Sequence, residues 1–368
     1  MSQRKHAIIV TISAFVLLLI GAVVYSQYYK VVDLHDYTEK SYYLQKFIYY
    51  FFAGGVGAGI AFVLLSHLRI NRKMILAYIL IMLTILIQLL TTQMPFVSMI
   101  SGRRYIRFLH INLEVSTITL ILLLMAFLVI QQKLSIMSKY ALFFLNGIGI
   151  IFVMLVAIDG DSENTVIAAL LFLFVLIRFS NSKLWMKLIN SMIYCFLIGG
   201  YYIGIMNQNM QNISTWLNPY QDKLGKGYMK VQDFEIIKSA SILGKSPYHN
   251  TYSGEILPTI LILFGWGVFI LSLGILIFML FHMFHMVSGK SGRLTGRIDI
   301  TIAVYFLMKL LFCILVFFNL LPFFQGGHLP FIGYGSELVI DILLLSIFLN
   351  QFKNRAIHNM SENIRTIA

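Results

Sequence analysis

Long apolar stretches recur along the whole chain and constrain its fold more than any other feature. A hydrocarbon core about 30 Å thick needs roughly 20 apolar residues for one helical crossing. The stretches are continuous and do not alternate in polarity, which favours helices over a membrane barrel. The sequence therefore predicts an all-α, polytopic membrane bundle. We expect about ten transmembrane helices, near residues 7–26, 45–67, 74–94, 109–131, 139–158, 164–179, 184–206, 255–287, 298–323 and 333–351.

The composition excludes an ordinary soluble domain. Of the 368 residues, 59% are hydrophobic and 12% are charged, whereas soluble domains carry about a quarter charged residues. The net charge of +13 is explained by basic cytoplasmic loops and anionic lipid headgroups, so we expect a membrane partner and no nucleic acid. The first stretch lacks a small-residue cleavage site, which indicates a retained helix and not a signal peptide.

The distribution of Lys and Arg predicts the orientation. Basic residues concentrate in the short loops that are cytoplasmic when the N-terminus is inside, for example at Arg69, Arg72, Lys290 and Arg293. The opposite loops mix basic residues with acids. We therefore predict a multi-pass protein of the bacterial cytoplasmic (inner) membrane with both termini in the cytoplasm.

The chain is predicted to form a single domain, residues 1–368, because no linker or repeat divides it. Its largest polar segment is 207–254, which the parity of the crossings places outside the cell as a loop between the seventh and eighth helices. Loops of that length are usually functional or disordered. Five aromatic residues favour folded structure, and residues 230–243 are expected to form a short amphipathic helix on the membrane interface.

Ionisable residues inside the crossings are informative because a charge in the bilayer needs a partner or a wet cavity. Glu114, Lys309, Glu337 and Asp341 are such residues, and Glu255 stands at a helix entrance. Glu337 and Asp341 are four residues apart and share one helix face. Pairing of Lys309 with either acid would be a structural tie or part of a substrate path, and the sequence leaves both open.

A basic cluster, SGRRYIRF at 101–108, lies at the predicted outer membrane boundary. Arg103, Arg104 and Arg107 supply guanidinium groups, which bind phosphate in a bidentate manner. A lipid-linked pyrophosphate would suit this cluster. Contact with phospholipid headgroups is the simpler alternative.

Two other motifs are expected to serve packing. GGVGAG at 54–59 lacks the Lys-Ser/Thr ending of a phosphate loop and lies inside a predicted helix, where small residues allow close helix approach. His282 and His285 share one helix face, but no third ligand accompanies them in the sequence, so packing is preferred to a metal site.

The string STWLNPYQDKLGKGYMKVQ at 214–232 resembles the extracellular signature of the SEDS family (shape, elongation, division and sporulation proteins, including RodA, FtsW and SpoVE). In that family Trp-Leu-Asn-Pro is followed by Asp and then by Gly-x-Gly-Tyr. The residues that match this signature are Trp216, Leu217, Asn218, Pro219, Asp222, Gly225, Gly227 and Tyr228.

Two further segments resemble the same family. GGHLPFIGYGSELV at 326–339 is similar to its Leu-Pro-Phe-x-Ser-Tyr-Gly-Gly-Ser signature, with Gly333 in place of Ser and the second Gly missing or shifted. SGRRYIRF followed by Glu114 is similar to a third region, and Thr117 stands where the family often has Lys. The three matches occur in the family's order and span most of the chain.

The resemblance implies a glycosyltransferase that polymerises lipid II, an undecaprenyl-pyrophosphate-linked precursor, at the outer face beside a class B penicillin-binding protein. It assigns no certain cofactor and leaves a divalent cation open. The residues that it implies for substrate binding, together with the basic cluster, are Arg103, Arg104, Arg107, Glu114, Trp216, Asn218, Pro219, Asp222, Tyr228, Pro330, Tyr334 and Ser336.

The family's essential Asp before the eighth helix is absent. Alignment of SPYHNTYSGEILP with the family's Pro-x-x-His-Thr-Asp-Phe pattern puts Tyr252, Gly254 or Glu255 at that position. Either Glu255 is the catalytic base or the chain binds precursor without polymerising it. A non-enzymatic scaffold or regulator of a penicillin-binding protein and a flippase for the lipid-linked precursor are the alternatives. The sequence does not distinguish cell elongation, division and sporulation.

Overall fold

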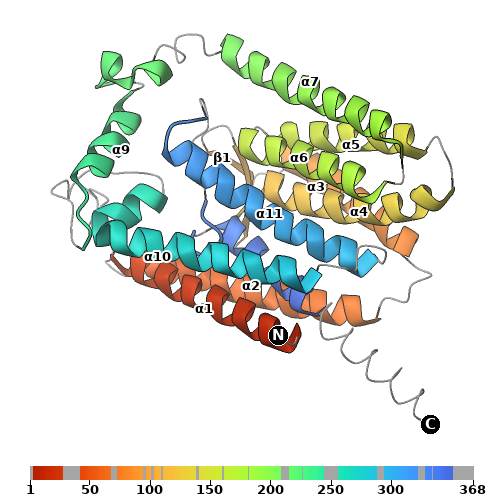
Figure 1. Ribbon diagram of the computed structural model, residues 1–368, viewed down its shortest axis with the longest axis horizontal. Helices are drawn as coiled ribbons and strands as arrows, with labels where there is room; N and C mark the ends of the chain where they lie inside the picture. The colour runs from red at the N-terminus through yellow and green to blue at the C-terminus, as the bar shows by residue number, and fades with distance from the viewer. Residues whose placement is uncertain are drawn as a thin grey trace.

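The computed structural model is a helical bundle (Figure 1), and it has a long helix in each of the ten segments that were predicted to cross the membrane. The structure describes residues 3–27, 42–67, 73–93, 97–100, 103–108, 111–137, 141–159, 161–180, 182–208, 215–225, 227–243, 256–287, 294–321, 328–333 and 335–350. Within these ranges the long helices are α1 (Gln3–Gln27), α2 (Tyr42–His67), α3 (Lys73–Gln93), α4 (Val115–Met137), α5 (Ala141–Ala157), α6 (Ser162–Phe179), α7 (Leu184–Gln208), α10 (Ile256–Val287), α11 (Leu294–Phe317) and a last helix over residues 336–350.

Seven of the helices in the described part of the chain are long and apolar enough to cross a membrane: α1, α3, α4, α6, α7, α10 and α11. Large apolar side chains such as Met82 on α3 and Phe196 on α7 are exposed, as expected where lipid is the solvent. The prediction of a polytopic α-helical membrane protein is confirmed.

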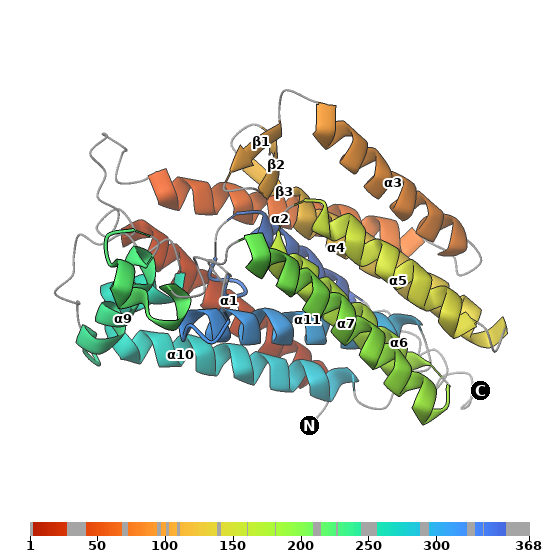
Figure 2. The ribbon, with the colours of Figure 1, turned by 90° about the horizontal axis from the view of Figure 1, so that it is seen from above.

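Helices α4, α6 and α11 lie inside the bundle, whereas α3 and α7 lie at its periphery (Figure 2). The rings of Phe127 on α4 and Phe172 on α6 meet edge to face with centroids 4.9 Å apart. Helix α1 packs along α10 in the most extensive helix contact of the described residues. The charged residues described below lie between the buried helices.

The predicted start of the fourth crossing at residue 109 is wrong, because α4 begins at Val115. The residues before it form a small antiparallel sheet of β1 (Val97–Ile100), β2 (Arg103–Phe108) and β3 (Ile111–Glu114), in the order β1-β2-β3. Tyr105 pairs with Glu114 and Phe108 with Ile111. Aromatic and β-branched residues such as Tyr105, Ile106 and Phe108 suit a pleated strand, and the sheet places the arginines of β2 beside the start of α4.

The GGVGAG motif packs as predicted. A Cβ atom at Gly54 would lie 2.9 Å from Cδ1 of Ile342 on the last helix and 3.3 Å from the Val339 backbone. The missing side chain therefore allows α2 to approach the last helix closely.

Helix α10 is broken at Gly265, whose φ of 74° and ψ of −173° are not helical. The amide of Trp266 donates to the Ser241 carbonyl at 2.9 Å, and the amide of Gly267 donates to the Ile242 carbonyl at 2.8 Å. The segment that contains these carbonyls follows α9 (Tyr228–Ser239). The amphipathic helix predicted over 230–243 instead spans Tyr228–Ser239. The amide of Ala240 still donates to the Ile236 carbonyl of the helix, whereas the carbonyls of Ser241 and Ile242 accept from α10. Its location on the membrane interface stays a prediction.

Candidate functional site

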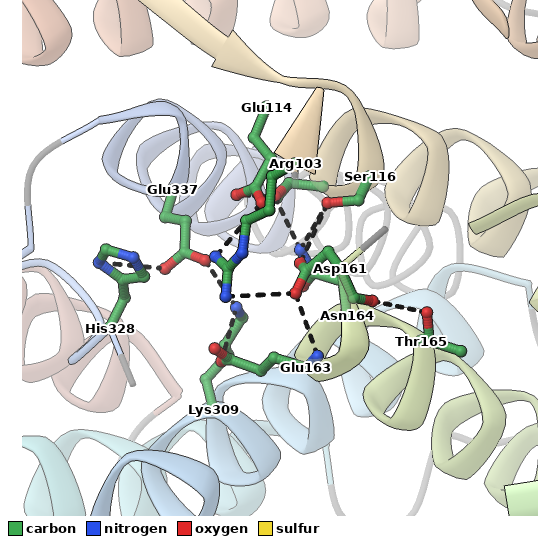
Figure 3. A network of polar contacts seen from close by, with 11 residues as sticks. Arg103, Glu114, Ser116, Asp161, Glu163, Asn164, Thr165, Lys309, His328 and Glu337 are labelled. Carbon is green, nitrogen blue, oxygen red and sulfur yellow. Dashed lines mark hydrogen bonds and ion pairs between the residues drawn. The ribbon is translucent and has the colours of Figure 1, made fainter. Parts of the chain in front are cut away.

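Six charged side chains from distant parts of the sequence meet at one end of the bundle (Figure 3). We call them the charged cluster: Arg103 of β2, Glu114 of β3, Asp161 and Glu163 at the start of α6, Lys309 of α11 and Glu337 of the last helix. Asp161 is also the N-cap of α6, since its Oδ1 accepts from the Glu163 amide at 3.0 Å. The fold of α6 therefore fixes two of the four acids.

Arg103 is held between two carboxylates. Its Nη1 lies 3.4 Å from Glu114 Oε1 and its Nη2 lies 3.5 Å from Asp161 Oδ1, with the side chain 17% exposed. Burial alone would lower the pKa of Arg103, but the carboxylates of Asp161 and Glu114 outweigh burial and raise it above its ordinary value. The guanidinium therefore remains charged.

Lys309 is buried in the centre of the cluster, with 2% of its side chain exposed. Its Nζ lies 2.8 Å from Glu337 Oε1 and 3.1 Å from Glu163 Oε1. Of the two acids that the sequence offered as partners, Glu337 is the one that pairs with Lys309, and Glu163 is a second partner that the sequence did not indicate. One ammonium group thus joins α6, α11 and the last helix.

A layer of neutral polar groups supports the acids from α4 and α6. Ser116 Oγ donates to Asp161 Oδ2 at 3.1 Å, and Thr117 Oγ1 donates to Glu114 Oε2 at 3.3 Å. The amide group of Asn164 donates to both hydroxyl oxygens at 3.0 Å. These bonds fix the orientation of both carboxylates.

The charged cluster holds four acids and two permanent cations, and this imbalance affects Glu114. Burial, followed by the charge of Asp161, raises the pKa of Glu114 from 4.5 to about 8, although Arg103 opposes the shift. A carboxyl group that titrates near neutral pH can both accept and donate a proton. The cluster is thus suited to proton transfer beside a cationic group.

Arg104 lies in a neighbouring pair, with its Nη1 3.9 Å from Asp159 Oδ1. Gln88 of α3 also donates to Asp159, at 2.8 Å. Burial raises the pKa of Asp159 from 3.8 to about 6. Arg107 is exposed on the same strand. Of the three predicted arginines, two are therefore engaged by acids near the start of α6, and one faces the surroundings.

The second signature forms a tight turn beside the cluster. Phe331 has a positive φ of 67°, and its amide donates to Asp341 Oδ2 at 2.9 Å. Pro330 and Ser336 are buried. His328 Nδ1 lies 3.8 Å from Glu337 Oε2. Tyr334 lies outside the described residues.

The first signature lies against the end of α11. Trp216 Nε1 donates to the Asn319 carbonyl at 3.1 Å, and Asn319 Nδ2 donates to the Trp216 carbonyl at 3.3 Å. Pro219, in the short 3-10 helix Pro219–Asp222, is buried. Its carbonyl would lie 2.2 Å from a Cβ at Gly227, which explains the glycine there. The exposed members of this signature are Leu217, Asn218, Asp222, Gly225 and Tyr228.

The structure thus brings Arg103, Arg104 and Glu114 together around the start of α6. Trp216 is held separately, by Asn319 just beyond the end of α11. Glu255, the predicted base, lies outside the described residues. Asp159, Asp161 and Glu163 were not predicted as site residues; they are among the acids of the loops opposite the cytoplasmic ones. The sequence does contain a pattern that could have indicated them, since these three acids stand at every second position immediately before a predicted crossing.

The described residues contain no group of three or more His, Cys, Asp and Glu side chains arranged to hold a metal ion. His282 instead lies with its Nδ1 2.7 Å from His6 Nδ1, so it joins α10 to α1. This contact fits the packing role predicted for the His-rich segment.

Comparisons with known proteins agree on one family. The family described as Cell cycle protein, which groups FtsW, RodA and SpoVE, matches residues 7–356. The probable peptidoglycan glycosyltransferase FtsW of Borreliella burgdorferi is 25% identical over 222 residues, which cover 55% of this chain and 58% of that protein. The match thus spans less than two thirds of the relative's length.

Solved structures show the same fold. The structure of a peptidoglycan synthase complex includes a chain that matches with a TM-score of 0.69 and 16% identity, covering 94% of this chain and 97% of that one. The rod shape determining protein RodA of Thermus thermophilus matches with a TM-score of 0.62 and 14% identity, over 94% and 96% of the two chains. A mutant of the same protein gives a TM-score of 0.65 at 13% identity, over 94% and 97%.

Proposed function

Because the chain belongs to the FtsW, RodA and SpoVE family of cell cycle proteins, we propose that it binds lipid II and transfers its glycan to a growing strand. The reaction would take place at the outer face of the membrane. We further propose that a class B penicillin-binding protein accompanies it, as in the family to which the chain belongs.

The charged cluster is the observation that carries this proposal. Five of its six charged side chains are buried and Arg103 is partly buried, which is costly in a membrane bundle, and such groups in membrane proteins mark substrate or ion paths by default. The cluster combines cations suited to a pyrophosphate with carboxylates suited to proton transfer.

The proposed roles follow from the chemistry of glycosyl transfer. A base must take the proton of the attacking sugar hydroxyl, and cations must stabilise the departing pyrophosphate. We assign Arg103, Arg104 and Arg107 to the pyrophosphate and keep Glu255 as a candidate base. The remaining substrate contacts are proposed from the signatures: Glu114, Trp216, Asn218, Pro219, Asp222, Tyr228, Pro330, Tyr334 and Ser336.

Reconstitution would test the proposal. The full chain would be purified, placed in proteoliposomes with a class B penicillin-binding protein, and supplied with lipid II. We expect glycan product in the wild type and little in Arg103→Gln, with Lys133→Gln as the control because Lys133 is an exposed cation at the far end of α4. Failure to form product with any partner would refute polymerisation, and failure to bind lipid II would refute the whole proposal.

A scaffold that holds a penicillin-binding protein is the second candidate, and the missing family Asp favours it. Co-purification from native membranes decides this point, since a scaffold must bring its partner with it even when lipid II is not turned over. A flippase is the third candidate, suggested by the intramembrane charges of Lys309 and Glu337. It requires that neutralising them stops lipid translocation in vesicles while the protein stays folded.

A further inference from the structure

His328 lies beside the charged cluster, and the proposed reaction assigns it no role. Its Nδ1 lies 3.8 Å from Glu337 Oε2, and its side chain is 34% exposed. One edge of the imidazole therefore faces a buried carboxylate (Figure 3), and the exposed fraction shows that part of the ring remains accessible.

The backbone around His328 is fixed. The amides of Ile332 and Gly333 both donate to the Leu329 carbonyl, at 3.2 and 3.1 Å. Asp341 holds the Phe331 amide, and Phe331 keeps a positive φ that is strained for a bulky residue. Strain of this kind persists only where the surroundings impose it, and it concentrates at functional sites.

Glu337 is fixed as well, because Lys309 Nζ bonds its other oxygen at 2.8 Å. A carboxylate beside Nδ1 favours the tautomer that carries hydrogen on Nδ1 and leaves Nε2 as the proton acceptor. The Nδ1 to Oε2 separation is long for a hydrogen bond, but catalytic hydrogen bonds often tighten only when substrate binds.

The other candidate bases in the described cluster each share a cation. Glu114 and Asp161 contact Arg103, and Glu163 and Glu337 contact Lys309. An imidazole with an accessible edge is better placed to take a proton from a bound sugar than a carboxylate held by an ammonium or guanidinium group.

We propose that His328, in place of Glu255, accepts the proton of the attacking hydroxyl and that Glu337 is its positioning residue. This inference rests on the proposed function. The hydroxyl oxygen bonds to the anomeric carbon of the donor sugar, and the bond from that carbon to the pyrophosphate oxygen breaks. The electron pair leaves with the polyprenyl pyrophosphate, and the proton moves to Nε2 of His328 and then to water.

Variants in the reconstituted assay test the role. A general base contributes about 10²–10⁴-fold, so His328→Gln should lose about that factor in rate while it still binds lipid II. In the wild type the rate should fall at acid pH as the imidazole is protonated, and this acid limb should be absent from the residual activity of His328→Gln. The charged groups that face this imidazole directly or through Glu337 are Glu337, Lys309 and Glu163.

Glu337→Gln should lower the rate and change the same acid limb. His285→Gln is the matched control, because His285 is an exposed imidazole near the C-terminal end of α10 and is not part of the charged cluster. Loss of less than about threefold in His328→Gln, far below the contribution of a general base, would overturn the proposal.

Chemical labelling gives a readout that does not need turnover. Diethyl pyrocarbonate should modify His328, as detected by mass spectrometry, and bound lipid II should protect it while His285 remains reactive. Binding of lipid II without protection of His328 would overturn this inference and leave the proposed function standing. Absence of lipid II binding would overturn both.

Discussion

Lys309 Nζ lies 2.8 Å from Glu337 Oε1 and 3.1 Å from Glu163 Oε1. It thus joins α11 and the last helix, which are neighbours in the sequence, to α6 from the middle of the chain. All three side chains are almost completely buried. The cost of burying these charges is offset only while the ammonium and both carboxylates are present together.

Lys309→Met should therefore destabilise the protein by about 3–5 kcal/mol, the usual cost of leaving a buried charge without its partner. Lys133→Met, which alters an exposed lysine, is the control. Thermal unfolding in detergent measures the difference. Adding Glu163→Gln and Glu337→Gln to Lys309→Met should recover much of the loss, and an additive further loss would contradict this account.

The stability of the protein should depend on pH through Glu114. Its pKa is raised from 4.5 to about 8, so the folded protein keeps this proton at a pH where the unfolded chain has lost it. Stability should thus fall as the pH rises through this window, by on the order of 1 kcal/mol per pH unit.

Glu114→Gln removes this titration, so its melting temperature should decline less than that of the wild type between about pH 6 and pH 8. The lower limit avoids Asp159, whose raised pKa of about 6 affects both proteins. If the melting temperatures of the wild type and of Glu114→Gln instead change in parallel with pH over this range, Glu114 is ionised in the folded state.

Gly267→Ala should separate the segment 240–243 from α10. A Cβ at Gly267 would lie 2.9 Å from the Ile242 carbonyl, and relief of such overpacking costs about 1–3 kcal/mol. Hydrogen exchange should become faster at the amides of Trp266 and Gly267. Gly274→Ala is the control on the same helix, since a Cβ there meets no described atom within 4 Å. Equal exchange in both variants would rule out the contact.

Gly54→Ala should weaken the contact between α2 and the last helix, because its new Cβ would lie 2.9 Å from Ile342. We expect a loss of about 1–3 kcal/mol. Gly55→Ala adds the same methyl group where no described atom lies within 4 Å, so it should be neutral or slightly stabilising. Thermal unfolding of the two variants side by side is the measurement.

The sequence predicted the bundle well because a helix that crosses the bilayer needs about 20 apolar residues, and such stretches are visible directly in the hydropathy. Family membership, suggested by three short motifs, is confirmed by the match over residues 7–356. The sheet before α4 was missed because the apolar residues of 109–114 extend the hydropathy of the following crossing. Periodicity alone does not separate a short apolar strand from a helix end.

The site was predicted only in part. Arg103, Glu114, Lys309 and Glu337 were identified because a charge near or within an apolar crossing is conspicuous. Asp161, Glu163 and His328 were not, since their positions beside those charges depend on how α6, α11 and the last helix pack. The assignment of Glu255 stays a prediction, as do the orientation of the chain and the boundaries 207–254.

The break in α10 has a mechanical consequence for the protein. Gly265 lies about 14 Å along the helix from Ile256, and there the amides of Trp266 and Gly267 are satisfied by carbonyls from outside the helix. Withdrawal of residues 241 and 242 would expose two donors where the bilayer offers no replacement. The break in α10 and the position of the segment after α9 are therefore coupled through these two hydrogen bonds, on a helix that also packs along α1.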